Sequence, residues 1–204
     1  MTKLYLGTEA PTQEDTYHYP VIKIVPRPLT VDIQCVFNQI EEITHILFTS
    51  KNSVQIFFDY IKEDLLKRKT FVCVGKKTAE RLLKRGFIAD IIADEETQEG
   101  IIQQLKLLNF EEPYFLFPKS SLSRPALHQF FLKSGIRHQV CDLYDTHIQR
   151  LEPVPDLSQF TEIIFTSPST VKGFFNIFSS IPNNVNVIAL GPITKNALLC
   201  YNAS

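Results

Sequence analysis

The sequence predicts an α/β protein built from two doubly wound parallel-sheet domains, one of which is discontinuous along the chain. Three observations predict it: strand-like and helix-like patterns alternate, one strand–turn–helix segment occurs twice, and too few strands follow its second copy to form a sheet. The chain has 204 residues, which is enough for one large or two small domains. Its 44% apolar and 21% charged residues are typical of a globular protein with real cores.

The repeated segment is HILFTSKNSVQIFF, residues 45–58, which returns as EIIFTSPSTVKGFF at residues 162–175. A second similarity follows each copy at nearly the same distance. FVCVGKKTAERLL, around Gly75, returns as VIALGPITKNALL, around Gly191. A repeat of this length decides the fold, so it is considered before the single elements. It predicts that a strand–turn–helix–strand–turn–helix unit occurs twice.

The first third of the chain is the least regular. Residues 3–6 and 19–25 read as strands, and the second strand is ended by Pro26 and Pro28, which fix φ and supply no backbone donor. Residues 30–42 carry apolar side chains at nearly helical spacing. They predict a short helix or a linker.

From His45 onwards strands and helices alternate clearly. Val54, Phe57, Phe58 and Ile61 recur at i, i+3, i+4 and i+7, the apolar stripe of a helix that follows a strand. Parallel neighbours need helical crossovers, so five strands with four intervening helices predict a parallel, doubly wound sheet. The predicted strands are 46–48, 71–74, 88–93, 114–117 and 139–144, and the predicted helices begin after residues 50 and 75 or span 100–108 and 124–133.

The last third predicts how the domains are divided. Residues 145–160 contain Pro153 and Pro155 and read as a connection. Strands at 163–165 and 185–190, each followed by a helix, are too few for a sheet, while the two N-terminal strands lack helices. We therefore predict two flavodoxin-like domains joined by a two-segment linker. The discontinuous domain takes residues 1–30 plus 148–204, and the inserted domain takes residues 31–147.

Composition argues against several functional classes. The formal net charge of −1 gives no global field to recruit nucleic acid or a membrane surface. The four cysteines are far apart and the five histidines lack metal-ligand spacing, so we expect reduced thiols and no metal site. No apolar run approaches the roughly 20 residues of a membrane span. We expect a soluble, cytoplasmic, monomeric protein whose partner is a small molecule.

Hydroxyl and glycine residues mark the predicted turns between strands and helices. Open parallel sheets bind ligands outside the carboxyl ends of their strands, and helix N-termini with free N–H groups favour anions. The alternative is that these hydroxyls only cap helices, as serine commonly does. The candidate binding residues at these turns are Thr49, Ser50, Gly75, Thr78, Thr166, Ser167, Gly191 and Thr194.

Three further residues are candidates at the same edge. Lys119 and Arg124 follow the strand at 114–117 and could hold an anionic ligand. Tyr144 ends the last predicted strand of the inserted domain. It is either an acid or donor that projects into a cleft, or an interface aromatic with its hydroxyl in water.

Together these positions resemble the uroporphyrinogen-III synthases. The order and spacing of several short motifs carry the resemblance, which spans most of the chain. The family has two α/β domains, the first discontinuous. The matching motifs are FTS at 48–50, VGKKT at 74–78, FP with an arginine at 117–124, YDT at 144–146, FTSPS at 165–169 and LGPIT at 190–194.

The resemblance implies a substrate and a reaction. The substrate would be hydroxymethylbilane, a linear tetrapyrrole with eight carboxylates. It would be closed to uroporphyrinogen III, with inversion of ring D and loss of water, by a lyase of porphyrin and haem biosynthesis that uses no metal or cofactor. Tyr144 would help the terminal hydroxyl to depart. Ser50, Thr78, Ser167 and Thr194 would contact the substrate.

Some features differ from the family pattern and keep rival interpretations open. Glu9 follows Thr8 where the family usually has a basic residue, and the family usually adds a strand and a helix after the LGPIT helix. We therefore expect a four-stranded terminal sheet with an exposed edge. One alternative is a non-catalytic, two-lobed protein that binds a small anionic ligand. A phosphate-using transferase is disfavoured, because GKKT lacks the upstream glycine of a phosphate loop.

Overall fold

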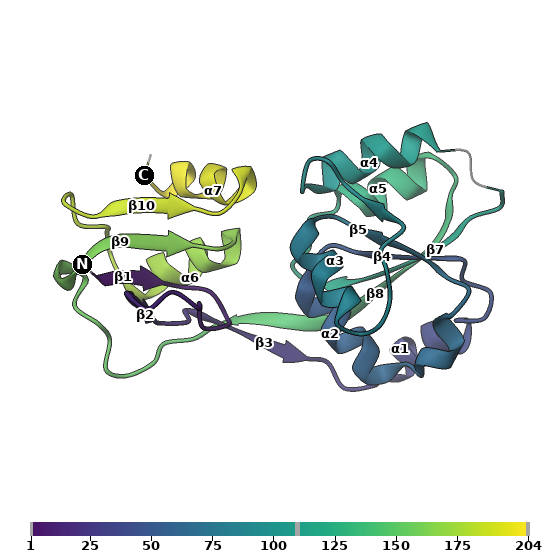
Figure 1. Ribbon diagram of the computed structural model, residues 1–204, viewed down its shortest axis with the longest axis horizontal. Helices are drawn as coiled ribbons and strands as arrows, with labels where there is room; N and C mark the ends of the chain where they lie inside the picture. The colour runs from purple at the N-terminus through teal and green to yellow at the C-terminus, as the bar shows by residue number, and fades with distance from the viewer. Residues whose placement is uncertain (1, 109–110, 203–204) are drawn as a thin grey trace. The chain divides into compact units, whose positions relative to one another are not determined.

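The computed structural model describes residues 2–108 and 111–202, which form two compact units (Figure 1). Unit 1 takes the chain up to residue 24 and again from residue 146, and unit 2 takes residues 25–145. Unit 1 is therefore discontinuous and unit 2 is continuous. The divisions lie a few residues from those predicted, which were after residue 30 and before residue 148.

Unit 2 contains a six-stranded sheet with the order β3-β8-β7-β4-β5-β6. From β8 to β6 the neighbouring strands are parallel. In Figure 1, α4 and α5 lie on one side of this sheet and α1, α2 and α3 on the other. The strands are β3 (Ile22–Pro26), β4 (His45–Phe48), β5 (Thr70–Cys73), β6 (Ile91–Ile92), β7 (Tyr114–Ser120) and β8 (Arg137–Ile148), and the helices are α1 (Val31–Asn38), α2 (Lys51–Tyr60), α3 (Lys76–Leu83), α4 (Gln98–Leu107) and α5 (Ala126–Lys133), with a 3₁₀ turn at Glu63–Leu66.

Aromatic side chains build the core of unit 2. Phe48 on β4 and Phe57 on α2 are both fully buried, with ring centroids 5.4 Å apart in an edge-to-face arrangement. On the other side of the sheet, Phe115 of β7 packs 5.0 Å from Phe131 of α5. The predicted stripe on α2 is thus buried, and it holds this helix against the sheet.

Three strand predictions need correction. The predicted strand 19–25 corresponds to β3, which begins at Ile22 and lies in the sheet of unit 2, and β2 (Thr16–His18) in the sheet of unit 1 was not predicted. Between these two strands Pro20 has no N–H to donate to a ladder. The Tyr19 hydroxyl donates to Leu151 O at 2.8 Å. The strand predicted at 88–93 shrinks to Ile91–Ile92, and Ile88 is 75% exposed. The strand predicted at 139–144 extends through β8, so the predicted connection begins as strand.

Unit 1 contains a four-stranded sheet with the order β10-β9-β1-β2, and all its pairs are parallel. Leu4, Leu6 and Phe165 lie in one core cluster with residues of α6 and α7, so within the described residues these two helices cover one face. We predicted a doubly wound sheet for this unit, with helices on both faces, and the described residues do not show one. Its elements are β1 (Thr2–Tyr5), β2, β9 (Phe160–Phe165), α6 (Pro168–Ile177), β10 (Asn186–Ala189) and α7 (Pro192–Asn202), with a 3₁₀ turn at Leu157–Gln159.

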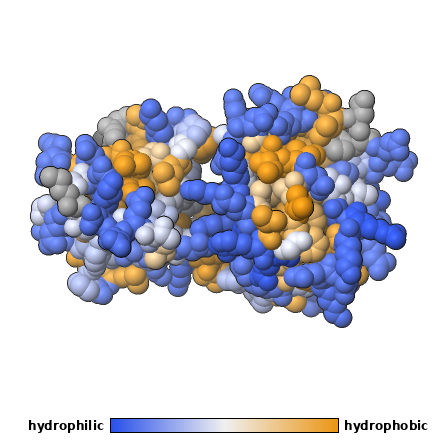
Figure 2. Space-filling model, viewed as in Figure 1, coloured by the Kyte–Doolittle hydropathy of each residue, from blue (hydrophilic) through white to orange (hydrophobic). Residues whose placement is uncertain are grey.

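The surface is mixed in polarity. Figure 2 shows apolar patches interrupted by hydrophilic side chains on both units. Across residues 2–108 and 111–202, no helix has the length and apolar character needed to cross a membrane.

Candidate active site

The order of the strands marks one place in each sheet where ligands are expected. In unit 2 the chain runs from β4 through β5 to β6 and then returns to β7 on the other side of β4. In unit 1 it runs from β1 to β2 and later to β9 on the other side of β1. Ligands of open α/β sheets bind at such switch points, beyond the carboxyl ends of the strands. Thr49 and Ser50 follow β4, and Thr166 and Ser167 follow β9.

Ser50 is the N-cap of α2 and the centre of a small hydroxyl network. Its backbone is extended, and its Oγ accepts a hydrogen bond from Ser53 N at 3.0 Å. The Tyr144 hydroxyl lies 2.8 Å from the same Oγ. Ser53 Oγ is 3.3 Å from Ser50 Oγ and donates to Ser50 O at 2.8 Å. The structure thus joins two of the predicted site residues directly, one after the end of β4 and one on β8.

Tyr144 lies inside β8 rather than at its end. Only 4% of its surface is exposed, so the hydroxyl in water that we considered is not what the structure shows. Burial raises the pKa of the Tyr144 phenol above its ordinary value, and the hydrogen bond with Ser50 lowers it by less. A phenol in this environment stays protonated at neutral pH. It can serve as a hydrogen-bond donor or weak acid, but it is poorly suited to act as a base.

Gly75 and Thr78 begin α3 next to an acidic side chain. Glu96 Oε1 accepts from Lys76 N at 3.1 Å, so a carboxylate already lies at this helix N-terminus. A Cβ on Gly75 would come within 2.7 Å of Glu96 Oε2, which explains why glycine suits this position. Thr78 is 5% exposed.

The two predicted cations are each paired with a carboxylate. Lys119 Nζ lies 2.6 Å from Asp142 Oδ1. Arg124 binds Glu99 in a bidentate pair with distances of 2.6 and 2.7 Å, and this pair lowers the pKa of the Glu99 carboxyl. Both cations lie in unit 2 at or just after the carboxyl end of β7, with acidic partners that we did not predict.

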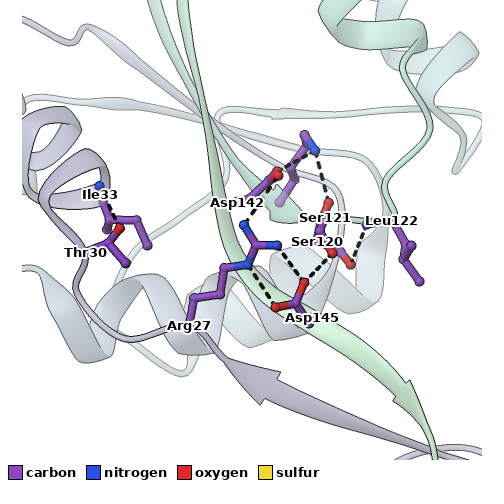
Figure 3. Close-up of polar contacts among 9 residues, drawn as sticks. Arg27, Thr30, Ile33, Ser120, Ser121, Leu122, Asp142 and Asp145 are labelled. Atoms are coloured by element: carbon purple, nitrogen blue, oxygen red, sulfur yellow. Dashed lines mark hydrogen bonds and ion pairs between the residues drawn. The ribbon is translucent and has the colours of Figure 1, made fainter.

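Figure 3 shows a further cluster that sequence reasoning missed, around Arg27 just after β3. Its Nε and Nη2 donate to the two carboxylate oxygens of Asp145 at 2.9 and 2.8 Å. Ser121 Oγ donates to Asp145 Oδ1 at 2.6 Å, and Arg27 Nη1 lies 3.8 Å from Asp142. The two aspartates flank Tyr144 in the sequence. The acidic residues on both sides of Tyr144 in the sequence CDLYD, residues 141–145, are the local feature from which the two aspartates could have been predicted.

In unit 1 the turn after β9 forms a complete capping box. Ser167 Oγ accepts from Thr170 N at 3.3 Å, and Thr170 Oγ1 accepts from Ser167 N at 3.1 Å. Thr166 N also donates to Thr170 Oγ1, at 3.1 Å. The Thr194 hydroxyl, 3% exposed, donates to Leu190 O at 3.0 Å, and Gly191 has a positive φ of 93°. These hydroxyls satisfy the backbone of their own turns.

Two further observations concern metal binding and the two buried thiols. Within residues 2–108 and 111–202, no cluster of three or more potential metal-ligating side chains is found. Burial raises the pKa of the Cys73 thiol to about 12 and that of the Cys141 thiol to about 12, so both are poor nucleophiles.

Comparison with known sequences places these motifs in one family. The model of the family described as uroporphyrinogen-III synthase HemD matches residues 12–203. The porphyrin biosynthesis protein HemD of Ruminiclostridium josui is 27% identical over 199 residues, which cover 90% of this chain. The chain spans 39% of the length of that relative. The uroporphyrinogen-III synthase of Chlorobaculum parvum is 28% identical over 167 residues, covering 75% of this chain and 68% of that protein.

Solved structures show the same fold. Uroporphyrinogen-III synthetase from Helicobacter pylori superposes with a TM-score of 0.67 at 18% identity, covering 99% of this chain and 87% of that chain. A mutant uroporphyrinogen III synthase from Thermus thermophilus gives a TM-score of 0.65 at 14% identity, covering 99% and 90%. The mixed α/β architecture with parallel sheets is shared. Because the family model covers nearly the whole sequence, the chain belongs to the uroporphyrinogen-III synthase HemD family.

Proposed function

We propose that the protein is a uroporphyrinogen-III synthase that closes hydroxymethylbilane to uroporphyrinogen III, with inversion of ring D and loss of water. The observation that carries the proposal is the hydrogen bond between Tyr144 and Ser50 at the switch point of unit 2, in a chain of this family. We take unit 2 to be a flavodoxin-like domain, and the two units to be joined by a two-segment linker. The enzyme would act as a lyase, in the cytoplasm, as a monomer and without a cofactor.

Tyr144 is proposed as the donor that helps the hydroxymethyl group lose its oxygen. As the C–O bond breaks, the departing oxygen gains negative charge, and the phenol donates a hydrogen bond and then its proton to it, so that water leaves. The proton released by the substrate when the ring closes would restore the phenol. The raised pKa of Tyr144 keeps this hydrogen available at neutral pH. Ser50 is bonded to the Tyr144 hydroxyl in the absence of substrate and would fix its direction.

The substrate carboxylates would be met by local donors rather than by a positive protein. Helix N-termini and short hydroxyls favour carboxylates, and holding the chain of pyrroles in a ring is largely a positioning task. Lys119 and Arg124 would share their charge between a substrate carboxylate and their present partners. The proposed contacts are Thr49, Ser50, Gly75, Thr78, Lys119, Arg124, Thr166, Ser167, Gly191 and Thr194.

The rival function is a two-lobed protein that binds a tetrapyrrole-like anion without chemistry. The family match over residues 12–203 does not favour it. It makes a different prediction, however: ligand would bind while the distribution of products stayed unchanged.

One assay separates the two functions. Freshly generated hydroxymethylbilane is mixed with the protein, and the ratio of the two cyclic isomers is measured. Spontaneous closure yields mainly isomer I, so a synthase raises the share of isomer III in proportion to protein concentration. Heat-unfolded protein is the control. An isomer ratio equal to that of the control would exclude synthase activity.

A further inference from the structure

The register between β7 and β8 changes just before Tyr144. Lys119 pairs with Asp142, but the next residue, Ser120, pairs with Tyr144, so Leu143 is an extra residue in β8. An extra residue of this kind is a β-bulge, and bulges commonly redirect a side chain beside a site. The irregularity therefore lies immediately before the residue proposed to act on the substrate.

The bulge changes which residues share a face of the strand. In a regular strand alternate residues face the same side, so Asp142 would share its side with Tyr144, and Asp145 would face the opposite side. The extra Leu143 reverses both relations. Asp145 comes to the side of Asp142, where Arg27 reaches both carboxylates, and Tyr144 turns away from them. Its hydroxyl then meets Ser50.

Groups on both sides of β8 hold this irregular segment. Arg27 N donates to Leu143 O at 2.8 Å from the side of β3, and Ser121 N donates to Tyr144 O at 3.1 Å from the side of β7. The side chains of the same two residues converge on Asp145, at 2.8 and 2.9 Å from Arg27 and 2.6 Å from Ser121. Figure 3 shows Asp145 between them. Tyr60 of α2 in turn donates to Arg27 O at 2.6 Å.

We propose that Arg27 and Asp145 are positioning residues for Tyr144: their bidentate ion pair fixes the bulge in β8 and so keeps the Tyr144 hydroxyl against Ser50. The role of Tyr144 in turnover rests on the proposed function, whereas its placement does not. An isolated ion pair at a surface contributes little, since its two side chains lose entropy. Here the pair is bidentate, and Ser121 binds the same carboxylate. Arg27 is hydrogen-bonded to the bulge through its backbone and Asp145 is part of β8, so the pair fixes the backbone conformation of the bulge.

The test compares Asp145→Asn and Arg27→Gln with the unchanged protein in two measurements. The first is steady-state formation of isomer III, where we expect kcat to fall by about 10- to 100-fold with little change in KM, as for a misplaced catalytic group. The second is the NMR titration of ring-labelled tyrosine, in which the Tyr144 signal is the one lost in Tyr144→Phe. We expect the pKa of Tyr144 to move down towards its ordinary value, because a released ring becomes less buried. Arg27→Lys keeps the positive charge but loses the bidentate hydrogen bonds, so its kcat and its Tyr144 pKa should lie between those of the unchanged protein and Arg27→Gln.

The matched control breaks a different ion pair on the same strand. Arg137 at the start of β8 binds Glu42 at 2.6 Å, so Glu42→Gln should change neither kcat nor the Tyr144 titration. If Asp145→Asn does not fold, Ser121→Ala removes a single bond to Asp145 and is measured in the same way. Unchanged kcat and unchanged titration in the folded variants would overturn the proposal. If the unchanged protein forms no isomer III, the proposed function fails, and the titration still decides whether the ion pair positions Tyr144.

Discussion

The turns after β4 and β9 have nearly the same backbone but different neighbours. Ser50 and Ser167 are both N-caps in extended conformation, with φ and ψ of −153° and 152° for Ser50 and −163° and 163° for Ser167. Each accepts a hydrogen bond from the backbone three residues on, at 3.0 and 3.3 Å. Ser167 completes a capping box within its own turn, whereas Ser50 also meets the hydroxyl of Tyr144.

One local structure thus occurs with two different sets of hydrogen-bond partners. The cap is set by local sequence and gives each helix a defined start. What distinguishes the turn after β4 is a residue from β8, almost a hundred positions further along the chain. A serine at a helix start is therefore weak evidence of function by itself. The evidence for function at this turn is the contact of Ser50 with the Tyr144 hydroxyl.

The largest effect is expected from Tyr144→Phe, which removes the Tyr144 hydroxyl and leaves Ser50 with hydrogen-bond partners from its own turn, like Ser167. We expect the rate of isomer III formation to fall by about 10²-fold or more, because the donor to the leaving oxygen is lost. Tyr114→Phe is the matched control, since it also removes the hydroxyl of a buried tyrosine, here one bonded to Gln39 at 2.8 Å. Undiminished turnover in Tyr144→Phe would remove its role as a donor.

A smaller difference is expected in stability between Ser50→Ala and Ser167→Ala. Both lose a cap worth about 1 kcal/mol. Ser50→Ala also leaves the buried Tyr144 hydroxyl without this partner, which adds about 1–3 kcal/mol to its cost. Urea unfolding followed separately in each unit measures the free energies. The excess should vanish when Ser50→Ala is made in a Tyr144→Phe background, and equal costs in the unchanged background would speak against the coupling.

The smallest difference is expected between the stability costs of Gly75→Ala, at the turn after β5, and Gly191→Ala, at the turn after β10. Gly191 has a φ of 93° with open space around it, so Gly191→Ala should cost about 1–2 kcal/mol through the backbone alone. Gly75 is extended and is crowded by Glu96, an exposed side chain that can move away. Gly75→Ala should therefore cost about 0.5–1 kcal/mol, the worth of one hydrogen bond. In a Glu96→Ala background that cost should disappear; its persistence would show that another contact is responsible.

Local periodicity was enough to predict the strand and helix on either side of the turns after β4 and β9. Val54, Phe57 and Phe58 are buried as their spacing indicated, because the apolar stripe of a helix records which face meets the sheet. The same reasoning placed Ser50 at a helix start. It could not indicate that Tyr144 would be its partner, since periodicity carries no information on distant strands.

The parts that were missed depend on pairing across long sequence distances. The contact of Arg27 with Asp145 spans 118 positions, and it requires the bulge at Leu143, which has no signature in composition. The carboxylate partners of Lys119 and Arg124 were missed for a similar reason, because several nearby acids could have filled that role. The pairing of β3 with β8 in the sheet of unit 2 was missed for the same reason, because the two strands are more than a hundred residues apart in the sequence.

The pairing of β1 with β9 also constrains how the protein is made. Leu4 lies beside Ile163, so β1 finds its neighbour β9 only after all of unit 2 has been synthesised. At roughly 5–20 residues per second, that delay is on the order of ten seconds. Unit 2, whose residues are contiguous, can fold meanwhile. Until β9 arrives, the edge of β1 and the side chains of Leu4 and Leu6 must be kept from pairing wrongly.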